Sequence, residues 1–221
     1  MAAITYQEAW SFLDGLQFFK IKLGLESMNA LLAELERPQQ HYPCIHIGGT
    51  NGKGSVGATL LAILNAAGYR AGLYTSPHLS SVRERFRIGE SYISKDEFAA
   101  VAGPIIQVLA GRQITYFEFT TALALLWFAR QKVDIALLEV GLGGRLDATN
   151  VVTPLVSVIT NISLDHEQYL GTTAGEIAAE KAGIIKANVP VVTGARQGEA
   201  LAVIEARAAC LRAPVYLLDR D

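Results

Sequence analysis

Apolar residues recur along the chain in two distinct patterns, which predict two kinds of secondary structure. Short continuous apolar runs predict buried strands, and the clearest is 133–140, where Ile135-Ala-Leu-Leu138 leads into Glu139. Longer stretches with apolar residues three and four positions apart predict helices, such as 117–130. The two patterns alternate along the chain. They therefore predict an α/β fold in which helices cover both faces of a doubly wound, mostly parallel sheet.

The predicted elements run through the whole chain. Strands are predicted at 43–45, 70–74, 133–140, 155–160, 189–193 and 215–218. Helices are predicted at 6–13, 25–35, 56–67, 95–109, 117–130, 173–182 and 199–211. The first two helices precede the first strand, and we expect them to form a helical cap packed on the domain. No repeat, low-complexity segment or linker interrupts the alternation, so residues 1–221 are expected to belong to one domain.

Composition and charge narrow the classes of protein to which the chain can belong. Apolar residues make up 51% of the 221 residues, enough for a sizeable core, and the net charge of −2 argues against nucleic acid as a partner. No signal peptide is visible, and the longest nearly apolar run, 119–129, is too short to span a bilayer. Cys44 and Cys210 are expected to be small core residues rather than a disulfide or metal pair. We expect a cytoplasmic protein that binds neither nucleic acid nor membrane.

A glycine-rich segment between the first predicted strand and the helix at 56–67 predicts a phosphate-binding loop. Glycines let successive backbone N–H groups face one point, the helix N-terminus adds partial positive charge, and a lysine supplies a mobile cation. The strict P-loop pattern fails, because it requires glycine at Ile47 and a hydroxyl at Gly54. The alternative is a glycine-rich turn with a surface lysine. The predicted nucleotide-binding residues are Gly49, Thr50, Asn51, Gly52, Lys53, Gly54 and Ser55.

Two further strand ends carry side chains that could hold a metal ion. Glu139 ends an apolar strand, where an acid can bind the Mg²⁺ that accompanies nucleotide phosphates. The alternative is that Glu139 forms a salt bridge with Arg145 or caps a turn. His166 follows the strand at 155–160 and is a candidate ligand at the same sheet edge, although a lone histidine is more often an ordinary hydrogen-bonded residue.

The segment after Glu139 is rich in glycine but does not fit a dinucleotide-binding fingerprint. Leu146 occupies the position of the third glycine in G-x-G-x-x-G, which excludes a Rossmann cofactor site. The glycines are expected to let the backbone approach a ligand closely, with Asp147 as a polar specificity group. The alternative is a tight loop in which Asp147 bonds its own turn.

Three arginines alternate after the strand at 70–74. In an extended chain, Arg83, Arg85 and Arg87 would share one face, with Phe86 and Ile88 on the other. Such alternation is usually a solvated strand face. Here it follows the carboxyl end of a strand, where open α/β sheets bind ligands, so the arginines are candidate substrate contacts.

Six motifs together resemble the folylpolyglutamate synthase/dihydrofolate synthase family of the Mur ligase superfamily. They stand in the order and spacing of that family, and the resemblance runs from about Tyr6 to the last residue. The motifs are His46-Ile-Gly-Gly-Thr-Asn-Gly-Lys-Gly-Ser55, Thr75-Ser-Pro-His-Leu79, Thr115-Tyr-Phe-Glu118, Glu139-Val-Gly-Leu-Gly-Gly-Arg-Leu-Asp-Ala-Thr-Asn150, Asp165-His166 and Glu180-Lys-Ala-Gly-Ile-Ile-Lys186.

The resemblance implies an ATP-dependent amide ligase that adds L-glutamate to dihydropteroate or a reduced folate through an acyl phosphate, acting as a monomer. It implies Mg²⁺ as cofactor and a carbamate on Lys181. Without the resemblance, Lys181 would be interpreted as a positive charge that stabilises the dipole at a helix C-terminus. The implied catalytic residues are Lys53, His166 and Lys181. The implied metal ligands are Ser76, Glu139, His166 and Lys181. The implied substrate contacts are Phe117, Asp147 and Ala148, with Arg83, Arg85 and Arg87 as weaker candidates.

Members of the family are substantially longer than this chain. Residues 1–221 are therefore expected to be an incomplete Mur-ligase-type ATP-binding domain without the C-terminal domain that binds glutamate. Two alternatives to the folate ligase stay open: a catalytically incomplete module that binds ATP and Mg²⁺, and another amide ligase of the superfamily.

Overall fold

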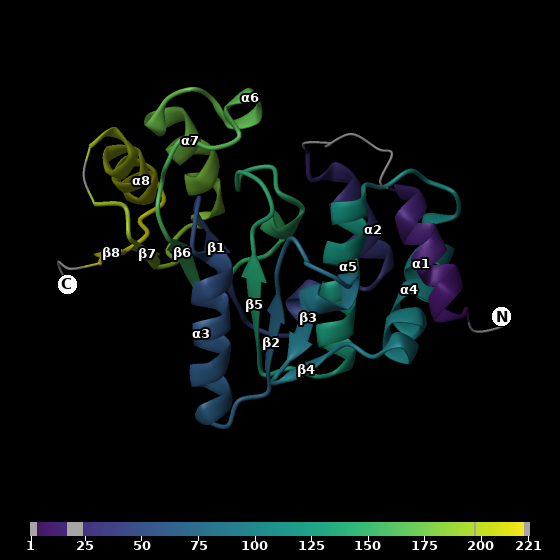
Figure 1. Ribbon diagram of the computed structural model, residues 1–221. Helices are drawn as coiled ribbons and strands as arrows, with labels where there is room; N and C mark the ends of the chain where they lie inside the picture. The colour runs from purple at the N-terminus through teal and green to yellow at the C-terminus, as the bar shows by residue number, and fades with distance from the viewer. Residues whose placement is uncertain (1–3, 17–23, 197, 219–221) are drawn as a thin grey trace.

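The computed structural model describes residues 4–16, 24–196 and 198–218, and its centre is one eight-stranded sheet (Figure 1). The strand order is β4-β3-β2-β5-β1-β6-β7-β8. The six strands β2, β5, β1, β6, β7 and β8 pair in parallel. At the β2 end of the sheet, β3 pairs antiparallel with β2, and β4 pairs antiparallel with β3. The strands are β1 (Cys44–Gly48), β2 (Ala71–Tyr74), β3 (Phe86–Ile88), β4 (Ser91–Tyr92), β5 (Ile135–Glu139), β6 (Val156–Ile159), β7 (Val191–Thr193) and β8 (Val215–Leu217). The predicted mostly parallel α/β fold is confirmed.

All seven predicted helices are present, with ends shifted by a few residues. The helices are α1 (Tyr6–Gly15), α2 (Glu26–Glu34), α3 (Lys53–Ala66), α4 (Lys95–Leu109), α5 (Tyr116–Arg130), α6 (Glu167–Leu170), α7 (Ala174–Lys181) and α8 (Glu199–Cys210). Short 3-10 helices lie at η2 (Pro38–Gln40), η3 (Val82–Arg85), η4 (Ala148–Val151) and η5 (Ala182–Ile184). Capping boxes fix the starts of α1, α4, α5 and α7 at Thr5, Ser94, Thr115 and Thr173. The four-residue α6 and the 3-10 helices were not predicted, because they are too short to show a period.

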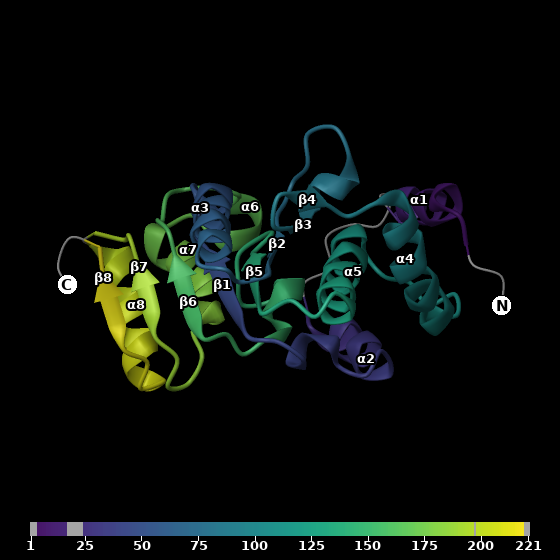
Figure 2. The same cartoon turned by 90° about the horizontal axis from the view of Figure 1, so that it is seen from below.

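Helices lie on both faces of the sheet, and the side chains of β5 show how the faces are divided. Leu137 belongs to the apolar cluster beneath α3, whereas Ala136 and Leu138 belong to the larger cluster that includes α5. Figure 2 shows α3 on one side of the central strands and α8 on the other side of β7 and β8. Burial on both faces explains why β5 is a continuous apolar run rather than an alternating one.

The largest apolar cluster joins α1, α2, α4 and α5 to the β2–β5 half of the sheet. Its aromatic residues Tyr74, Phe86 and Phe98 pack in sequence, with ring centroids 5.7 and 6.0 Å apart. The N-terminal helices therefore form the predicted cap. Cys44 is buried as expected, but Cys210 is exposed at the end of α8, so the prediction that both are core residues is wrong for Cys210.

The predicted extended arrangement of the three arginines is wrong. Arg83 and Arg85 lie in the 3-10 helix η3, and only Arg87 lies on a strand. The reason is local: Ser81 and Glu84 form a capping box, which starts a helical turn where the alternation suggested a strand. The guanidinium of Arg83 therefore donates to the Ile93 carbonyl at 2.6 Å, on the side of β4.

The carboxyl ends of the parallel strands gather the predicted site residues at one edge of the sheet. This is the edge to which the arrow of β5 points in Figure 1. The phosphate loop follows β1, Ser76 follows β2, and Glu139 is the last residue of β5. Ligands of open parallel sheets bind at this edge. Among the described residues, no helix combines the length and the apolar character that crossing a membrane would require.

The aromatic packing in the large cluster generates a stability prediction. Phe86 is fully buried, so Phe86→Ala removes ring contacts to Tyr74 and Phe98 and leaves a cavity. We expect a loss of about 3–5 kcal/mol in the free energy of unfolding, measured by urea titration. Tyr69, which is 53% exposed, provides the control, since Tyr69→Ala should change the same quantity by less than about 0.5 kcal/mol. A loss below about 1 kcal/mol for Phe86→Ala would contradict the packing described here.

Candidate nucleotide and substrate site

The phosphate loop is held in place by the segment that follows β6. Asn161 accepts hydrogen bonds from two loop amides. Its carbonyl oxygen accepts from Thr50 N at 2.9 Å, and its side-chain oxygen accepts from Asn51 N at 2.8 Å. The Thr160 hydroxyl donates to the Asn51 carbonyl at 2.6 Å. A Cβ on Gly49 would lie 1.9 Å from that hydroxyl oxygen, so only glycine fits there. The amides of Thr50 and Asn51 thus shape the loop rather than face a ligand.

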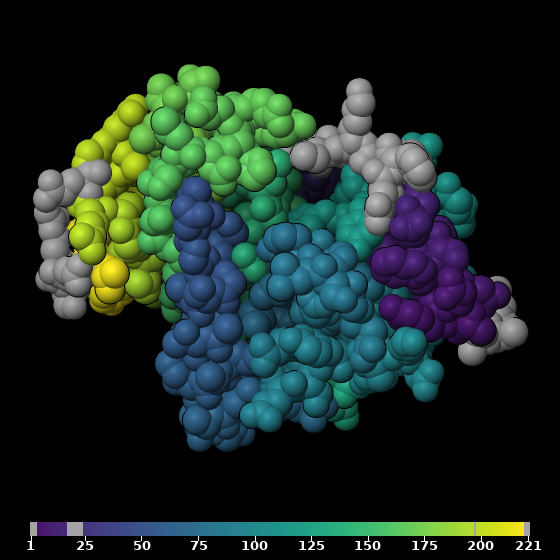
Figure 3. All heavy atoms as spheres, in the orientation of Figure 1, coloured from purple at the N-terminus to yellow at the C-terminus, as the bar shows by residue number. Residues whose placement is uncertain are grey.

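The amides available to an anion are those at the start of α3. Gly52 precedes the helix with φ +81°, a conformation that favours glycine, and the helix begins at Lys53. The first N–H groups of a helix have no intrahelical acceptor, so those of Lys53, Gly54 and Ser55 are free to bind an anion. Figure 3 shows the green atoms of α6 and α7 directly above the blue atoms at the start of α3.

Two lysines donate to one carbonyl oxygen in the loop. Lys53 Nζ lies 3.0 Å from the Gly49 and Thr50 carbonyl oxygens, and Lys181 Nζ lies 3.1 Å from the same Gly49 oxygen. Lys181 is the last residue of α7 and is only 4% exposed. Burial lowers the pKa of Lys181 to about 8, and the neighbouring charge of Lys53 acts in the same direction. Most Lys181 still carries its proton near physiological pH, but the neutral fraction is larger than for an ordinary lysine.

Glu139 is buried next to the helix start, as the sequence predicted. Its Oε2 accepts the Ser76 amide at 3.2 Å, and a Cβ on Gly54 would lie 3.6 Å from the same oxygen. Burial raises the pKa of Glu139, while the Ser76 hydrogen bond and the charge of Lys53 oppose the rise. The alternative of a salt bridge with Arg145 is wrong, because Arg145 pairs with Glu180 at 2.8 Å.

His166 occupies a different environment from Glu139. It precedes α6 with φ +50°, its side chain is 54% exposed, and its Nε2 lies 3.7 Å from Asp165 Oδ1. Within the part of the chain that the structure describes, no three His, Cys, Asp or Glu side chains stand close enough together to hold a metal ion. An ion shared by His166 and Glu139 therefore stays a prediction.

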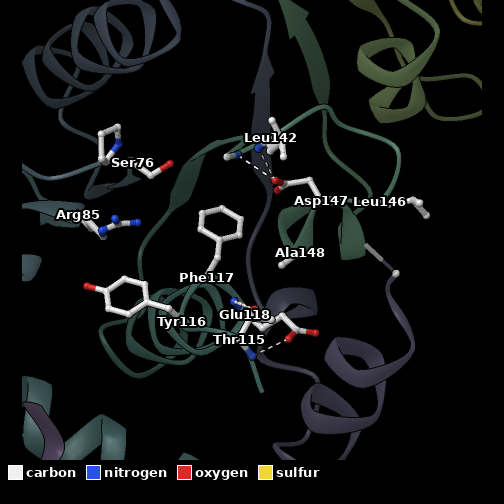
Figure 4. A pocket seen from close by; sticks show the side chains of 13 residues that line it. Ser76, Arg85, Thr115, Tyr116, Phe117, Glu118, Leu142, Leu146, Asp147 and Ala148 are labelled. Atoms are coloured by element: carbon white, nitrogen blue, oxygen red, sulfur yellow. Dashed lines mark hydrogen bonds between the residues drawn. The ribbon is translucent and has the colours of Figure 1, made fainter. Parts of the chain in front are cut away.

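An apolar cavity of about 330 Å³ opens beside Glu139 (Figure 4). Figure 4 shows the Phe117 ring in the centre, with Ser76 and Arg85 on one side and Asp147 and Ala148 on the other. Four of the predicted substrate contacts, Phe117, Asp147, Ala148 and Arg85, thus line one cavity, whereas Arg83 does not. The remaining lining residues are Gly24, Pro77, Thr115, Tyr116, Glu118, Gly141, Leu142 and Leu146.

Arg85 is the basic residue of the cavity wall, which also includes the acidic residues Glu118 and Asp147. It is only 8% exposed, its Nε donates to His78 Nδ1 at 2.9 Å, and its guanidinium lies 5.3 Å from the centre of the Tyr116 ring. No ion pair of Arg85 occurs among the described residues. Sequence reasoning missed Tyr116, although its place inside the Thr115–Glu118 capping box marks the start of α5, which carries Phe117 into the cavity.

Asp147 forms hydrogen bonds within its own loop, which is the tight-loop alternative given in the sequence analysis. Its Oδ2 accepts the amides of Gly141 and Leu142 at 3.0 and 2.9 Å, and its Oδ1 accepts the Thr149 amide at 2.9 Å. Burial raises the pKa of Asp147, and these hydrogen bonds oppose the rise. Asp147 therefore fixes the backbone of the loop that forms this part of the cavity wall.

The loop at residues 141–147, here called the cavity loop, packs backbone to backbone against the end of α7. Arg145 N donates to the Glu180 carbonyl at 2.8 Å. A Cβ on Gly144 would lie 2.8 Å from that carbonyl oxygen, and a Cβ on Gly183 would lie 2.4 Å from the Arg145 Cα. The segment that carries Lys181 and the segment that lines the cavity are thus in direct contact.

Comparison with known proteins identifies the family. The Mur ligase middle domain matches residues 47–193. The chain belongs to the Mur ligase family. It is 44% identical over 221 residues to the dihydrofolate synthase/folylpolyglutamate synthase of Bacillus subtilis (strain 168), covering 97% of this chain and 51% of that protein.

Two solved structures are similar to this Mur ligase chain in sequence and fold. The folylpolyglutamate synthase of Thermotoga maritima shares 46% identity at a TM-score of 0.90, covering 98% of this chain and 50% of that one. An FPGS-AMPPCP-folate complex shares 38% identity at a TM-score of 0.94, covering 99% and 55%. The chain therefore spans about half the length of the relatives that it matches.

The two-lysine arrangement generates a titration prediction. The pKa of Lys181 is lowered to about 8 from an ordinary value of 10.5, partly by Lys53. Lys53→Gln removes that charge, so the pKa of Lys181 should rise toward its ordinary value. The measurement is an NMR titration of labelled lysine side chains, with Lys132→Gln, a change at an exposed lysine, as the control. A Lys181 signal that titrates at its ordinary value in the unmodified protein would rule out the buried arrangement.

Proposed function

We propose that this chain supplies the ATP-binding domain of an amide ligase that adds L-glutamate to dihydropteroate or a reduced folate. One observation carries the proposal: the acid beside the phosphate loop also contacts a residue of the cavity wall. Glu139 lies against Gly54 on one side and accepts the amide of Ser76, a cavity residue, on the other. A nucleotide on the loop and an acid in the cavity would therefore meet at Glu139.

The proposed reaction is the formation of an acyl phosphate. A carboxylate oxygen of the substrate attacks the γ-phosphorus of ATP, and ADP leaves with the electrons of the broken phosphoanhydride bond. The amine of glutamate then attacks the acyl carbon, loses a proton, and expels phosphate. Both partners of the first step are anions, so positive charge must lie between them before the reacting atoms can align. Lys53 and the amides at the start of α3 supply such charge.

The cavity suits a flat, partly aromatic substrate with an acidic group. Phe117 and Tyr116 offer aromatic surface, and Leu146 and Ala148 add apolar walls. Arg85 contributes a cation that forms no ion pair among the described residues. A pteridine ring fits the aromatic part by its shape and polarity. The FPGS-AMPPCP-folate complex supports a folate as the ligand of this cavity, and its nucleotide analogue supports ATP as the ligand of the loop.

The donor set around Glu139 fits Mg²⁺. Magnesium is usually bound in proteins by one or two carboxylates together with substrate phosphates and water, so a cluster of three acidic or histidine side chains is not required. Glu139 and the Ser76 hydroxyl would hold the ion, and His166 stays a predicted third ligand. When bound, Mg²⁺ supplies further countercharge to the phosphates.

Lys181 is proposed to carry a carbamate. Its neutral amine nitrogen attacks the carbon of CO₂, so that a C–N bond forms while one C=O π bond breaks and its electrons move to oxygen. The nitrogen, now positively charged, releases one proton to water and leaves a carbamate. The lowered pKa of about 8 supports this step, because only a neutral amine is a nucleophile. The resulting carboxylate beside Lys53 would be an additional oxygen ligand for a second Mg²⁺.

A second candidate function is a module that binds ATP and Mg²⁺ without ligase turnover. The chain spans about half the length of the relatives that it matches, so residues 1–221 are tested as such a module. To separate the two candidates, dihydropteroate and glutamate are added to the protein with ATP and Mg²⁺, and ADP is measured. Release of ADP would favour the ligase. Nucleotide binding without ADP release would favour the module. We further propose a cytoplasmic monomer.

The phosphate loop generates a binding prediction. Lys53→Ala removes the mobile cation while leaving the Asn161 contacts of the loop in place, so affinity for AMPPCP should fall about 100-fold. Isothermal titration calorimetry measures the dissociation constants. Lys132→Ala is the control, because its side chain is exposed and distant from the loop in sequence. An unchanged dissociation constant in Lys53→Ala would remove the proposed role of the loop.

The carbamate generates a mass prediction. Protein equilibrated with bicarbonate at pH above the Lys181 pKa of about 8 should gain the mass of one CO₂ on the peptide that contains Lys181. Trapping the carbamate by alkylation before native mass spectrometry provides the readout. The gain should disappear in Lys181→Gln and persist in Lys186→Gln, a lysine five positions later. If Lys181 stays a free amine with bicarbonate, Mg²⁺ and ATP present, the carbamate is wrong.

A further inference from the structure

A buried histidine in the central strand connects to the cavity by side-chain hydrogen bonds. His46 lies in β1 and is fully buried. Its Nε2 lies 2.8 Å from the Thr149 hydroxyl oxygen, and the Thr149 hydroxyl is hydrogen-bonded in turn to Asp147 Oδ1. Neither the proposed nucleotide contacts nor the proposed reaction uses His46, although it opens the glycine-rich motif.

The direction of these hydrogen bonds follows from the number of protons available. The Thr149 hydroxyl has one hydrogen, and a carboxylate can only accept, so that hydrogen goes to Asp147. His46 Nε2 must then donate to Thr149, which places the imidazole proton on Nε2. Burial, assisted by the charge of Lys186, lowers the pKa of His46 to about 3, so the ring is neutral and Nδ1 carries no proton. Nδ1 has no hydrogen-bond partner among the described residues.

The chain of hydrogen bonds ends at the wall of the cavity. Asp147 receives the Thr149 hydroxyl on Oδ1 and holds the amides of Gly141 and Leu142 on Oδ2. A Cβ on Gly141 would lie 2.5 Å from the Phe117 ring, so the backbone that Asp147 holds lies directly against that ring. Figure 4 shows the dashed bonds from the Asp147 carboxylate to this turn above Phe117.

We propose that His46 is a positioning residue for the cavity, which acts through Thr149 on Asp147 and so fixes the Gly141–Leu142 turn against Phe117. The inference rests on the proposed function only in taking the cavity as the substrate site. The position itself argues for a role beyond packing, because Cys44 on the same face of β1 and Leu138 in register on β5 both belong to the apolar core. A buried imidazole with one unpaired nitrogen destabilises a strand that an apolar residue would fill without that cost.

Hydrogen exchange tests the positioning role without any ligand. His46→Phe keeps a ring but removes the donor, and Thr149→Val keeps the shape of threonine but removes the hydroxyl. In both variants the Gly141 and Leu142 amides should exchange about tenfold faster, as expected for the loss of one supporting hydrogen bond. His46→Gln and Thr149→Ser retain a donor and a hydroxyl, and should restore exchange to within about twofold of the unmodified protein.

Ser157→Ala is the matched control for loss of a buried hydrogen bond. Ser157 pairs with His46 in register on β6, is fully buried, and donates to the Ile184 carbonyl at 3.0 Å. Its removal should leave the exchange of Gly141 and Leu142 unchanged. Unchanged exchange at these amides in both His46→Phe and Thr149→Val would overturn the proposal. Equal acceleration of all core amides would do the same, since it indicates general destabilisation.

Ligand binding tests the consequence for the substrate site. Thr149→Val should weaken folate binding about tenfold while the dissociation constant of AMPPCP changes by less than about twofold. The double variant His46→Phe/Thr149→Val should bind folate no more weakly than the weaker single variant, because both changes break one chain. Equal weakening for folate and AMPPCP would overturn the proposal. If the unmodified protein binds no folate, the proposed function fails, and the exchange experiment still decides the role of His46.

Discussion

Two ammonium groups that share one backbone carbonyl set the electrostatics of this site. Lys53 and Lys181 both donate to the Gly49 oxygen, and the buried cation of Arg85 lies on the nearby cavity wall. Glu139, the acid beside the start of α3, is itself buried, and this burial raises its pKa. Positive charge in a buried site is stable only when an anion neutralises it. The arrangement is therefore complementary to a polyanion.

The parallel sheet creates this concentration of charge from distant parts of the sequence. Lys53, Glu139 and Lys181 come from three segments, and they meet because β1 and β5 are neighbours whose carboxyl ends lie at one edge. Asn161 and Thr160, at the end of the next strand, fix the loop that carries the shared carbonyl. Charge, cavity and loop are thus consequences of strand order.

The sequence predicted the fold and most of the site because both depend on regular patterns. Continuous apolar runs identified the strands, and the glycine-rich loop, Glu139 and Phe117 were found at the predicted edge. The prediction for Arg83 failed because a capping box at Ser81 overrode the alternation. The hydrogen bonds from His46 to Asp147 could not be predicted, since they join residues about a hundred positions apart and depend on how the segment at η4 packs against β1.

The contact between the cavity loop and α7 couples the shape of the cavity to the position of the Lys181 amine. Gly144 and Gly183 leave no room for a methyl group between the backbone that forms the cavity and the backbone that carries Lys181. A side chain at either place would push the two segments apart, which would change the wall of the cavity and displace the Lys181 amine in the same movement. Substitutions at these two glycines therefore cannot reshape the cavity without also moving the amine.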